Sequence, residues 1–271
     1  MPKFRFQQLP EKVIYKIYII NLNNVPKCNL GKYSKIEITT LMEVEMESQL
    51  RVESKVKNND VKAMIGFLLI FYLVWTIKEL WLIDYIYSFG EIISPLLEAL
   101  VKGFVWIVPT WLYIKYYLHN NPFDYLRVNV NVKKGLFWGV VLSLLVGLYF
   151  AFETYIINQQ SFQFSLSIDD YLNAFLMAGL AEEIVFRGLI LQEINKKMAF
   201  WKANIVTALL FLVIHYPIWI YNDGFYDFFI AGTHIYVFAI GLLFGFVYKK
   251  TGSLWSVVLL HALHNFFVTI I

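Results

Sequence analysis

The sequence contains little cysteine and little charge. Its 271 residues include a single cysteine, Cys28, which excludes an intrachain disulfide and a cysteine-rich metal site. Charged residues make up only 16% of the chain, against about 25% in soluble domains. The formal net charge of +3 is too small to indicate nucleic-acid binding, and internal repeats and low-complexity tracts are also absent. The character of the chain is therefore set by its apolar residues.

Hydrophobic residues make up 59% of the chain and aromatic residues 18%, and the mean hydropathy is +0.57. A helix needs about twenty apolar residues to cross the ~30 Å hydrocarbon core of a bilayer. Seven stretches of this length alternate with short polar connections, at residues 64–87, 92–118, 135–157, 169–193, 199–221, 227–248 and 253–271. The sequence thus predicts an all-α, polytopic transmembrane helix bundle with the lipid bilayer as a partner.

The pattern also predicts a division of the chain. Residues 1–62 are rich in charge and contain no apolar run long enough to span a bilayer, so we expect a poorly ordered cytoplasmic extension there. Residues 63–134 hold the first two spans. Residues 135–271 hold the remaining five and carry most of the polar residues discussed below.

The basic residues of the connections predict the orientation of the chain. The first, third and fifth connections carry no lysine or arginine. The second, fourth and sixth carry them, at or near Lys115, Arg127, Lys133, Lys134, Lys196, Lys197, Lys202, Lys249 and Lys250. Because cytoplasmic loops are enriched in basic residues, we expect a multi-pass cell-membrane protein with a cytoplasmic N-terminus and an outside C-terminus.

Three charges lie inside the fourth predicted span. A charged side chain near the bilayer centre costs roughly 2.5–3.5 kcal/mol even on lenient insertion scales, so such residues indicate function by default. Glu183 and Arg187 are four residues apart, which predicts an internal ion pair. Glu182 projects about 100° away from Glu183 around a helix, and we expect it to lack a pairing cation and to act as a general base. In the second span, Glu98 and Lys102 are also four apart and can pair on one helix face.

Other polar residues fall at a similar depth in other spans. His215 is in the fifth span, and Pro217, two residues later, can loosen that helix. His261 and Asn265 are four apart in the last span, on one helix face. We expect Glu182, His215, His261 and Asn265 to converge on one water-filled pocket at mid-membrane depth. Catalytic roles are not expected for the other three histidines, of which His264 is interpreted as structural: His119, His234 and His264.

These residue types favour peptide hydrolysis. The reaction needs an activated water and donors for the oxyanion, and a carboxylate with histidine can supply the first while a His–Asn pair supplies the second. No serine or cysteine occupies these positions, which argues against a covalent nucleophile. Zinc is the alternative, since Glu and His are zinc ligands, but the His-Glu-x-x-His spacing of zinc proteases is missing. We therefore expect no cofactor.

The motifs resemble those of a known family. They are EExxxR from Glu182 to Arg187, FxxxH from Phe211 to His215, and HxxxN from His261 to Asn265, with Gly241, Gly245 and a Thr-Gly-Ser-Leu-Trp stretch at 251–255 before the last. In this order they are similar to the CPBP family, which joins type II CAAX prenyl endopeptidases with bacterial Abi and bacteriocin-immunity proteins. The resemblance covers roughly residues 135–271.

The resemblance implies an intramembrane glutamic endopeptidase with residues 135–271 as its CAAX protease-like catalytic core. Carried onto this sequence, it makes Glu182 the base that activates water with help from His215. His261 and Asn265 would form the oxyanion hole, and Glu183 and Arg187 would hold the motif helix in place. The implied substrate is a membrane-associated peptide or protein, in bacteriocin self-immunity or peptide maturation.

Two other functions remain open at this point. A non-catalytic membrane scaffold or immunity protein would bind a toxin, receptor or kinase partner and use the polar cluster for helix packing. An ion or proton transporter would use the buried carboxylates, although the sequence contains no inverted repeat and no pair of broken helices.

Overall fold

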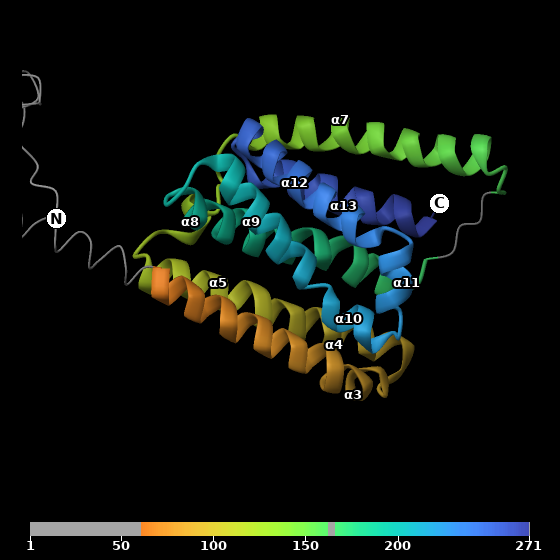
Figure 1. Ribbon diagram of the computed structural model, residues 1–271, viewed down its shortest axis with the longest axis horizontal. Coiled ribbons are helices and arrows are strands. Elements are labelled where there is room, and N and C mark those ends of the chain that lie inside the picture. The colour runs from red at the N-terminus through yellow and green to blue at the C-terminus, as the bar shows by residue number, and fades with distance from the viewer. Residues whose placement is uncertain (1–60, 162–165, 271) are drawn as a thin grey trace, which may run out of the picture. The chain divides into compact units, whose positions relative to one another are not determined.

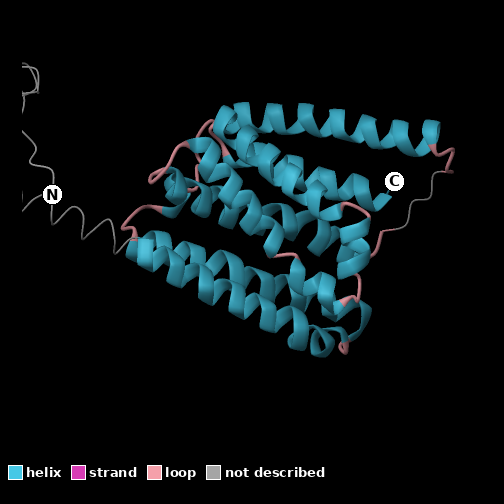
Figure 2. Ribbon diagram, viewed as in Figure 1, coloured by secondary structure: helices cyan, strands magenta, loops and turns pink. Residues whose placement is uncertain are grey.

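The computed structural model describes residues 61–161 and 166–270. Every secondary-structure element in these two ranges is a helix, as Figure 2 shows. The all-α prediction is therefore confirmed for this part of the chain. Contacts group the described residues from Ile65 onward into one compact unit. The predicted extension at 1–62 lies almost wholly outside the described residues, and the predicted borders at 62/63 and 134/135 stay predictions.

Two long helices come first. Residues 61–77 are α-helical, and the same helix continues through a π-helical and an α-helical segment: η3 (Lys78–Leu82) and α3 (Ile83–Tyr87). After a short turn the second helix alternates α and π segments: α4 (Gly90–Lys102), η4 (Gly103–Ile107), α5 (Val108–Leu112) and η5 (Tyr113–Tyr117).

The remaining elements form the rest of the bundle. The middle of the chain contains α6 (Pro122–Tyr125), α7 (Val132–Ala151), η6 (Phe152–Ile157), η7 (Asp170–Glu182), η8 (Ile184–Ile190) and α8 (Leu191–Asn195). The last part contains α9 (Phe200–Val213), α10 (Tyr216–Tyr221), α11 (Phe225–Ile230), α12 (Thr233–Thr251) and α13 (Leu254–Ile270).

Several of these helices can cross a membrane. Four are long and apolar enough, namely Val61–Tyr87, Gly90–Tyr117, Val132–Ile157 and Phe200–Tyr221. They match the first, second, third and fifth predicted spans to within a few residues, and α13 is a shorter apolar helix. The chain is therefore a multi-pass membrane protein. The count of seven spans and the orientation of the two termini stay predictions.

Helix α13 lies at the centre of the C-terminal packing. In Figure 1, α12 and α13 run between α7 on one side and α9 on the other, and contacts join α13 to α7, η7 and α12. Helix α7 meets α13 with small residues at every fourth position: Gly135, Gly139, Ser143 and Gly147. A Cβ added at Gly139 would lie 3.0 Å from the Cβ of Leu259. Small residues at this spacing let two membrane helices approach closely.

Close approach also places the helices that carry the motifs. A Cβ added at Gly179 in η7 would lie 2.9 Å from the backbone nitrogen of Ala262 in α13. A Cβ added at Gly241 in α12 would lie 3.1 Å from the Cβ of Ala208 in α9. Gly241 therefore permits close packing of α12 against α9. These contacts bring η7, α13, α12 and α9 together around the polar residues of the site.

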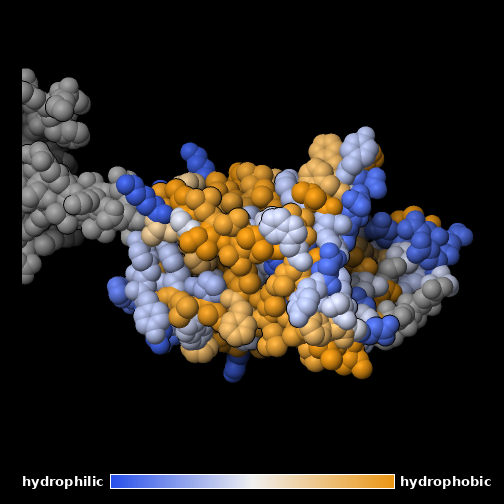
Figure 3. All heavy atoms as spheres, turned by 90° about the horizontal axis from the view of Figure 1, so that it is seen from below, coloured by the Kyte–Doolittle hydropathy of each residue, from blue (hydrophilic) through white to orange (hydrophobic). Residues whose placement is uncertain are grey.

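The first two helices expose apolar side chains outward. Figure 3 shows a broad apolar field on the face formed by these helices. Exposed apolar side chains of these two helices include Leu69 and Phe104, each 67% exposed, and Trp81, which is 73% exposed. Exposure of such a broad apolar surface to water would be unfavourable, whereas contact with lipid suits it. Three of their charged residues are instead buried: Lys78, Glu79 and Lys102 are each less than 9% exposed.

Candidate active site

The EExxxR motif lies at the junction of two π-helical segments. Glu182 is the last residue of η7, and Arg187 lies in η8. The sequence predicts one helix here, and the structure gives a continuous helix whose i→i+5 winding is wider than that of an α-helix. Gly179 and Gly188 lack side chains where Ala262 and Leu126 pack against the helix, so the wider winding is accommodated. Windings of this kind are frequent at functional sites.

Glu183 and Arg187 form the predicted ion pair. Arg187 Nη1 donates to Glu183 Oε1 at 2.8 Å, and both side chains are fully buried. Arg187 Nη2 also donates to the carbonyl oxygen of Gly241 at 3.0 Å, which ties the motif helix to α12. The guanidinium lies 4.5 Å from the ring centroid of Phe211 and 5.3 Å from that of Phe244, so aromatic faces cover the remaining charge. This pair therefore fastens three helices together.

Glu183 has a second role that the sequence did not predict. Its Oε1 also accepts a hydrogen bond from His261 Nδ1 in α13, at 2.8 Å. A carboxylate accepts here, so Nδ1 carries the hydrogen and Nε2 is the ring nitrogen that faces other groups. The chain Arg187–Glu183–His261 thus fixes the orientation of the imidazole. Depth alone could have indicated the contact, because both residues lie near the middle of their predicted spans.

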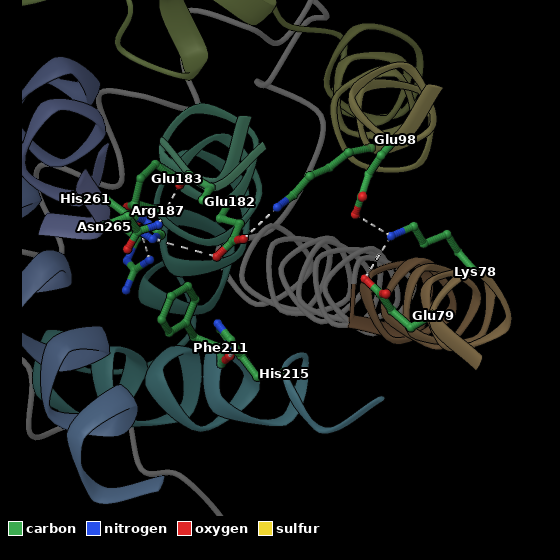
Figure 4. Close-up of polar contacts among 12 residues, drawn as sticks. Lys78, Glu79, Glu98, Glu182, Glu183, Arg187, Phe211, His215, His261 and Asn265 are labelled. Atoms are coloured by element: carbon green, nitrogen blue, oxygen red, sulfur yellow. Dashed lines mark hydrogen bonds and ion pairs between the residues drawn. The ribbon is translucent and has the colours of Figure 1, made fainter. Parts of the chain in front are cut away.

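Glu182 is paired with a lysine, which corrects two predictions. Lys102 Nζ in α4 donates to Glu182 Oε1 at 2.9 Å, so the expectation that Glu182 lacks a cation is wrong. The expected pairing of Lys102 with Glu98 is also wrong, because Glu98 accepts from Lys78 at 2.8 Å instead. Lys102 and Glu98 each pair with a residue on another helix and not with each other, although they lie one turn apart on the same helix. Figure 4 shows both ion pairs as dashed lines.

A sequence signal for Lys102 did exist. Lys102 lies ten residues after the start of its predicted span and Glu182 thirteen after the start of its own, about 15 and 20 Å along the two helices. Both spans are predicted to run inward from the outer side. Depth matching, which singled out the histidines, would therefore also have placed Lys102 beside Glu182.

The second oxygen of Glu182 has a different environment. Oε2 is buried and receives no hydrogen bond from the residues that the structure describes. His261 Nε2 lies 4.0 Å from it, too far for a direct hydrogen bond. Glu182 itself is only 6% exposed. The carboxylate thus has one oxygen held by Lys102 and one that faces the imidazole of His261.

His215 lies at a break in the fifth predicted span. Helix α9 ends at Val213 and α10 begins at Tyr216 with Pro217 in its first turn, so the predicted loosening by Pro217 is confirmed. The backbone nitrogen of His215 donates to Leu212, and the carbonyl oxygen of Phe211 is left to accept from His215 Nδ1 at 2.7 Å. Because a carbonyl oxygen only accepts, Nδ1 carries the hydrogen and Nε2 is free to accept. In Figure 4 the imidazole points toward the helix that carries Glu182.

Asn265 is engaged elsewhere. Its Nδ2 donates to the carbonyl oxygen of Ala174 at 2.9 Å, and its Oδ1 lies 3.1 Å from His264 Nδ1. His264 Nε2 also bonds to the hydroxyl of Tyr236 at 2.5 Å, consistent with its interpretation as a structural residue. No hydrogen bond joins His261 to Asn265 among those formed by the described residues. The amide therefore supports the packing of α13 against η7 in this structure.

The predicted histidines outside the site are also placed. His234 is buried beneath the rings of Tyr216, Trp219 and Phe225, and His119 lies in a connection with a positive φ of 53°. The structure brings Glu182, Glu183, Arg187 and His261 into one cluster and turns His215 toward it. A single water-filled pocket shared with Asn265 stays a prediction.

The donor set does not fit a metal ion. Within 61–161 and 166–270, no group of three or more His, Cys, Asp or Glu side chains is arranged to hold one. Glu183 Oε1 and His261 Nδ1 are already occupied by each other, and Glu182 Oε1 is occupied by Lys102. We therefore derive no step through zinc.

The fold and the site define a class of protein. A multi-pass helical membrane protein with a buried carboxylate and two histidines on neighbouring helices is suited to hydrolysis within the membrane. The family model of type II CAAX prenyl endopeptidase Rce1-like proteins matches residues 164–267. The match supports the resemblance to the CAAX protease family that the motifs predicted, and it points to a protease. Neither the curated proteins nor the solved structures include a match to this chain.

Proposed function

We propose that the chain is an intramembrane endopeptidase that hydrolyses a peptide bond of a membrane-associated peptide or protein with water activated by Glu182. The observation that carries the proposal is the unequal setting of the two Glu182 oxygens. Oε1 is held by Lys102 at 2.9 Å, whereas Oε2 faces His261 Nε2 at 4.0 Å without a hydrogen bond from the described residues. A water between Oε2 and Nε2 would be within hydrogen-bonding reach of both.

The chemical steps follow from this setting. Oε2 takes a proton from the water while the water oxygen attacks the carbonyl carbon of the scissile bond. The carbonyl oxygen becomes an oxyanion. When the carbon–nitrogen bond breaks, the proton held by Glu182 passes to the leaving amine, which regenerates the carboxylate. His215 Nε2, a free acceptor, orients the water through its second hydrogen.

The oxyanion needs donors, and two are within the predicted set. His261 already donates from Nδ1 to Glu183, so it donates from Nε2 as well only in the imidazolium form, in which both ring nitrogens carry a hydrogen. Asn265 Nδ2 has two hydrogens, of which one goes to Ala174, so one remains for an oxyanion. We also propose that the reaction uses no metal; metal content and reversible loss of activity with chelators in the purified protein test this part.

The substrate class follows from the membrane setting and the family description. A site closed off by helices at membrane depth is reached most easily by a peptide anchored in the bilayer. The family description names prenyl endopeptidases, so we propose lipid-anchored peptides as the first substrates to examine. Bacteriocin self-immunity and peptide maturation are the proposed settings.

The experiment compares Glu182→Gln with the wild-type protein in liposomes. Both are given a mixture of prenylated and unprenylated membrane-anchored peptides, and new amino termini are identified by mass spectrometry. We expect the wild type to produce them and Glu182→Gln to lose about 10²- to 10⁴-fold in rate, since a positioned base is removed. Glu91→Gln is the matched control, because Glu91 is exposed and outside the site.

Folding must be measured in the same preparations, since Glu182→Gln leaves Lys102 without its partner. Size-exclusion profiles and thermal unfolding in detergent provide that check. Hydrolysis by a folded Glu182→Gln at the wild-type rate contradicts the proposed role of Glu182, whereas a folded wild type that cleaves none of the peptides favours the scaffold function.

A further inference from the structure

Lys102 is part of the surroundings of the candidate base, although it lies outside the segment that matches the protease family. The matched segment begins at residue 164, and Lys102 is the last residue of α4. Its Nζ lies 2.9 Å from Glu182 Oε1, and the two side chains are 10% and 8% exposed. The second predicted span therefore supplies a charged group directly to the candidate catalytic carboxylate.

The ammonium group is held in place by aromatic rings. Lys102 Nζ lies 5.3 Å from the ring centroid of Trp106 and 5.8 Å from that of Trp75. Trp106 is 1% exposed and packs edge-on against Phe186 of η8, with ring centroids 6.0 Å apart. The rings join the lysine to the motif helix through packing. The faces of the two rings thus attract the ammonium group and hold it beside Glu182.

Competing partners of Lys102 are occupied. Glu98, one turn earlier on the same helix, accepts from Lys78 at 2.8 Å, and Lys78 also lies 3.2 Å from Glu79. Lys78 thus engages both Glu79 and Glu98, as Figure 4 shows. Lys102 is left for Glu182.

A carboxylate at this depth needs a counter-ion to stay ionised. Burial disfavours the charged form, and a protonated carboxyl cannot take a proton from water. An opposite charge within ~4–6 Å lowers the pH at which a carboxyl group loses its proton by about 1–3 units, so the group stays ionised to lower pH. Among the residues that the structure describes, Lys102 is the lysine that pairs with Glu182, and Arg187 is engaged by Glu183.

We infer that Lys102 is a positioning residue of the active site, which keeps Glu182 ionised and holds Oε1 so that Oε2 is the oxygen that takes the proton. The inference rests on the proposed function. It also implies that the helix pair of residues 61–117 is required for catalysis as well as for insertion into the membrane.

The experiment uses Lys102→Met, which keeps much of the length of the side chain and removes the charge, and Lys102→Arg, which keeps the charge. Lys115→Met is the control, because Lys115 is exposed on the same long helix. Hydrolysis of the anchored peptide is measured against pH. We expect Lys102→Met to lose activity on acidification at a pH about 1–3 units higher than the wild type does. Below that pH its activity should be about 10- to 1,000-fold lower than that of the wild type. Lys102→Arg should lose activity at the same pH as the wild type, and Lys115→Met should match the wild type throughout.

A second readout does not depend on turnover. Infrared spectroscopy at neutral pH detects the carbonyl stretch of a protonated carboxyl group. Lys102→Met should show this band, and the wild type and the double variant Lys102→Met/Glu182→Gln should lack it. A folded Lys102→Met without the band, or with an unchanged pH profile beside an inactive Glu182→Gln, overturns the inference.

The two hypotheses can fail separately. Retained hydrolysis in Glu182→Gln contradicts the proposed function. The infrared band of Lys102→Met still shows whether Lys102 keeps Glu182 ionised. If Lys102→Met does not fold, the double variant with a neutral pair should fold. A double variant as unstable as the single one shows that pairing is not what Lys102 supplies, and the inference fails.

Discussion

At the scale of single residues, both histidines of the cluster are anchored through Nδ1. His215 donates from Nδ1 to the carbonyl oxygen of Phe211, and His261 donates from Nδ1 to Glu183. Each bond orients the ring and leaves Nε2 for other groups. A hydrogen bond on one ring nitrogen determines what the other can do. The anchoring is therefore as important for the chemistry as the presence of histidine.

This arrangement predicts the effect of His215→Asn. The amide of asparagine can replace Nδ1 and donate to Phe211, but it has no atom at the position of Nε2. We expect a folded protein whose hydrolysis rate is about 10²-fold lower, because the water loses an acceptor that orients it. Peptide cleavage in liposomes and thermal unfolding in detergent are measured together.

His119→Asn is the matched control for that variant. His119 has a positive φ of 53°, a conformation that asparagine tolerates well, and it lies in a connection outside the cluster. Its rate and unfolding temperature should equal those of the wild type. A His215→Asn protein that cleaves at the wild-type rate shows that Nε2 is not needed.

At the scale of helices, the site depends on how closely η7 approaches α13. Gly179 is three residues before Glu182, and a Cβ there would lie 2.9 Å from the nitrogen and 3.0 Å from the Cα of Ala262. These are backbone atoms, which cannot rotate away as a side chain can. Ala262 directly follows His261, so this contact sets the separation between the carboxylates and the imidazole.

We therefore expect Gly179→Ala to push η7 away from α13. Overpacking of this kind typically costs about 1–3 kcal/mol in the free energy of unfolding. A displacement of about 1 Å at the reacting groups can lower the rate about 10²-fold. We therefore expect the rate of peptide cleavage to fall further than the loss of folded protein alone would explain. Thermal unfolding and peptide cleavage measure the two effects.

Gly66→Ala provides the comparison for Gly179→Ala. No atom lies within 4 Å of a Cβ added at Gly66, which is in the first long helix. The same substitution there should leave activity unchanged and stabilise the helix by up to about 1 kcal/mol. Equal effects of the two substitutions contradict the importance of the close approach.

Helix positions were largely predictable from the sequence, whereas their local winding was not. Apolar length determined the four helices that can cross a membrane to within a few residues, and Pro217 indicated the break beside His215. The π-helical winding around Glu182 and Glu183 has no counterpart in hydropathy, because hydropathy does not distinguish a π-helix from an α-helix. The same holds for ion pairs between helices. The spacing of four residues correctly paired Glu183 with Arg187 but wrongly paired Glu98 with Lys102, since spacing carries no information about neighbouring helices.

At the scale of the whole molecule, the matched protease segment is not self-sufficient. It carries Glu182, His215, His261 and Asn265, but the counter-ion of Glu182 comes from α4. Tyr72 in the first helix also donates to the carbonyl oxygen of Leu210 in α9, at 2.5 Å. The N-terminal helix pair is thus joined both to the motif helix and to the helix that precedes His215. The motifs alone predict the residues of the matched segment, whereas the contribution of the N-terminal helix pair requires positions on different helices to be compared.

The orientation of this bundle is the remaining whole-molecule prediction. The predicted spans place Met198, between the fourth and fifth, in the cytoplasm, and Asp223, between the fifth and sixth, outside. Both are exposed. In a Cys28→Ser background, Met198→Cys should react with a membrane-impermeant maleimide only after the cells are permeabilised, whereas Asp223→Cys should react in intact cells. Because the helix between them is broken at Ile214 and His215, its crossing depends on both halves aligning. Labelling of both positions from the same side would show that residues 200–221 do not cross, and Glu182 would then lie beside a re-entrant element.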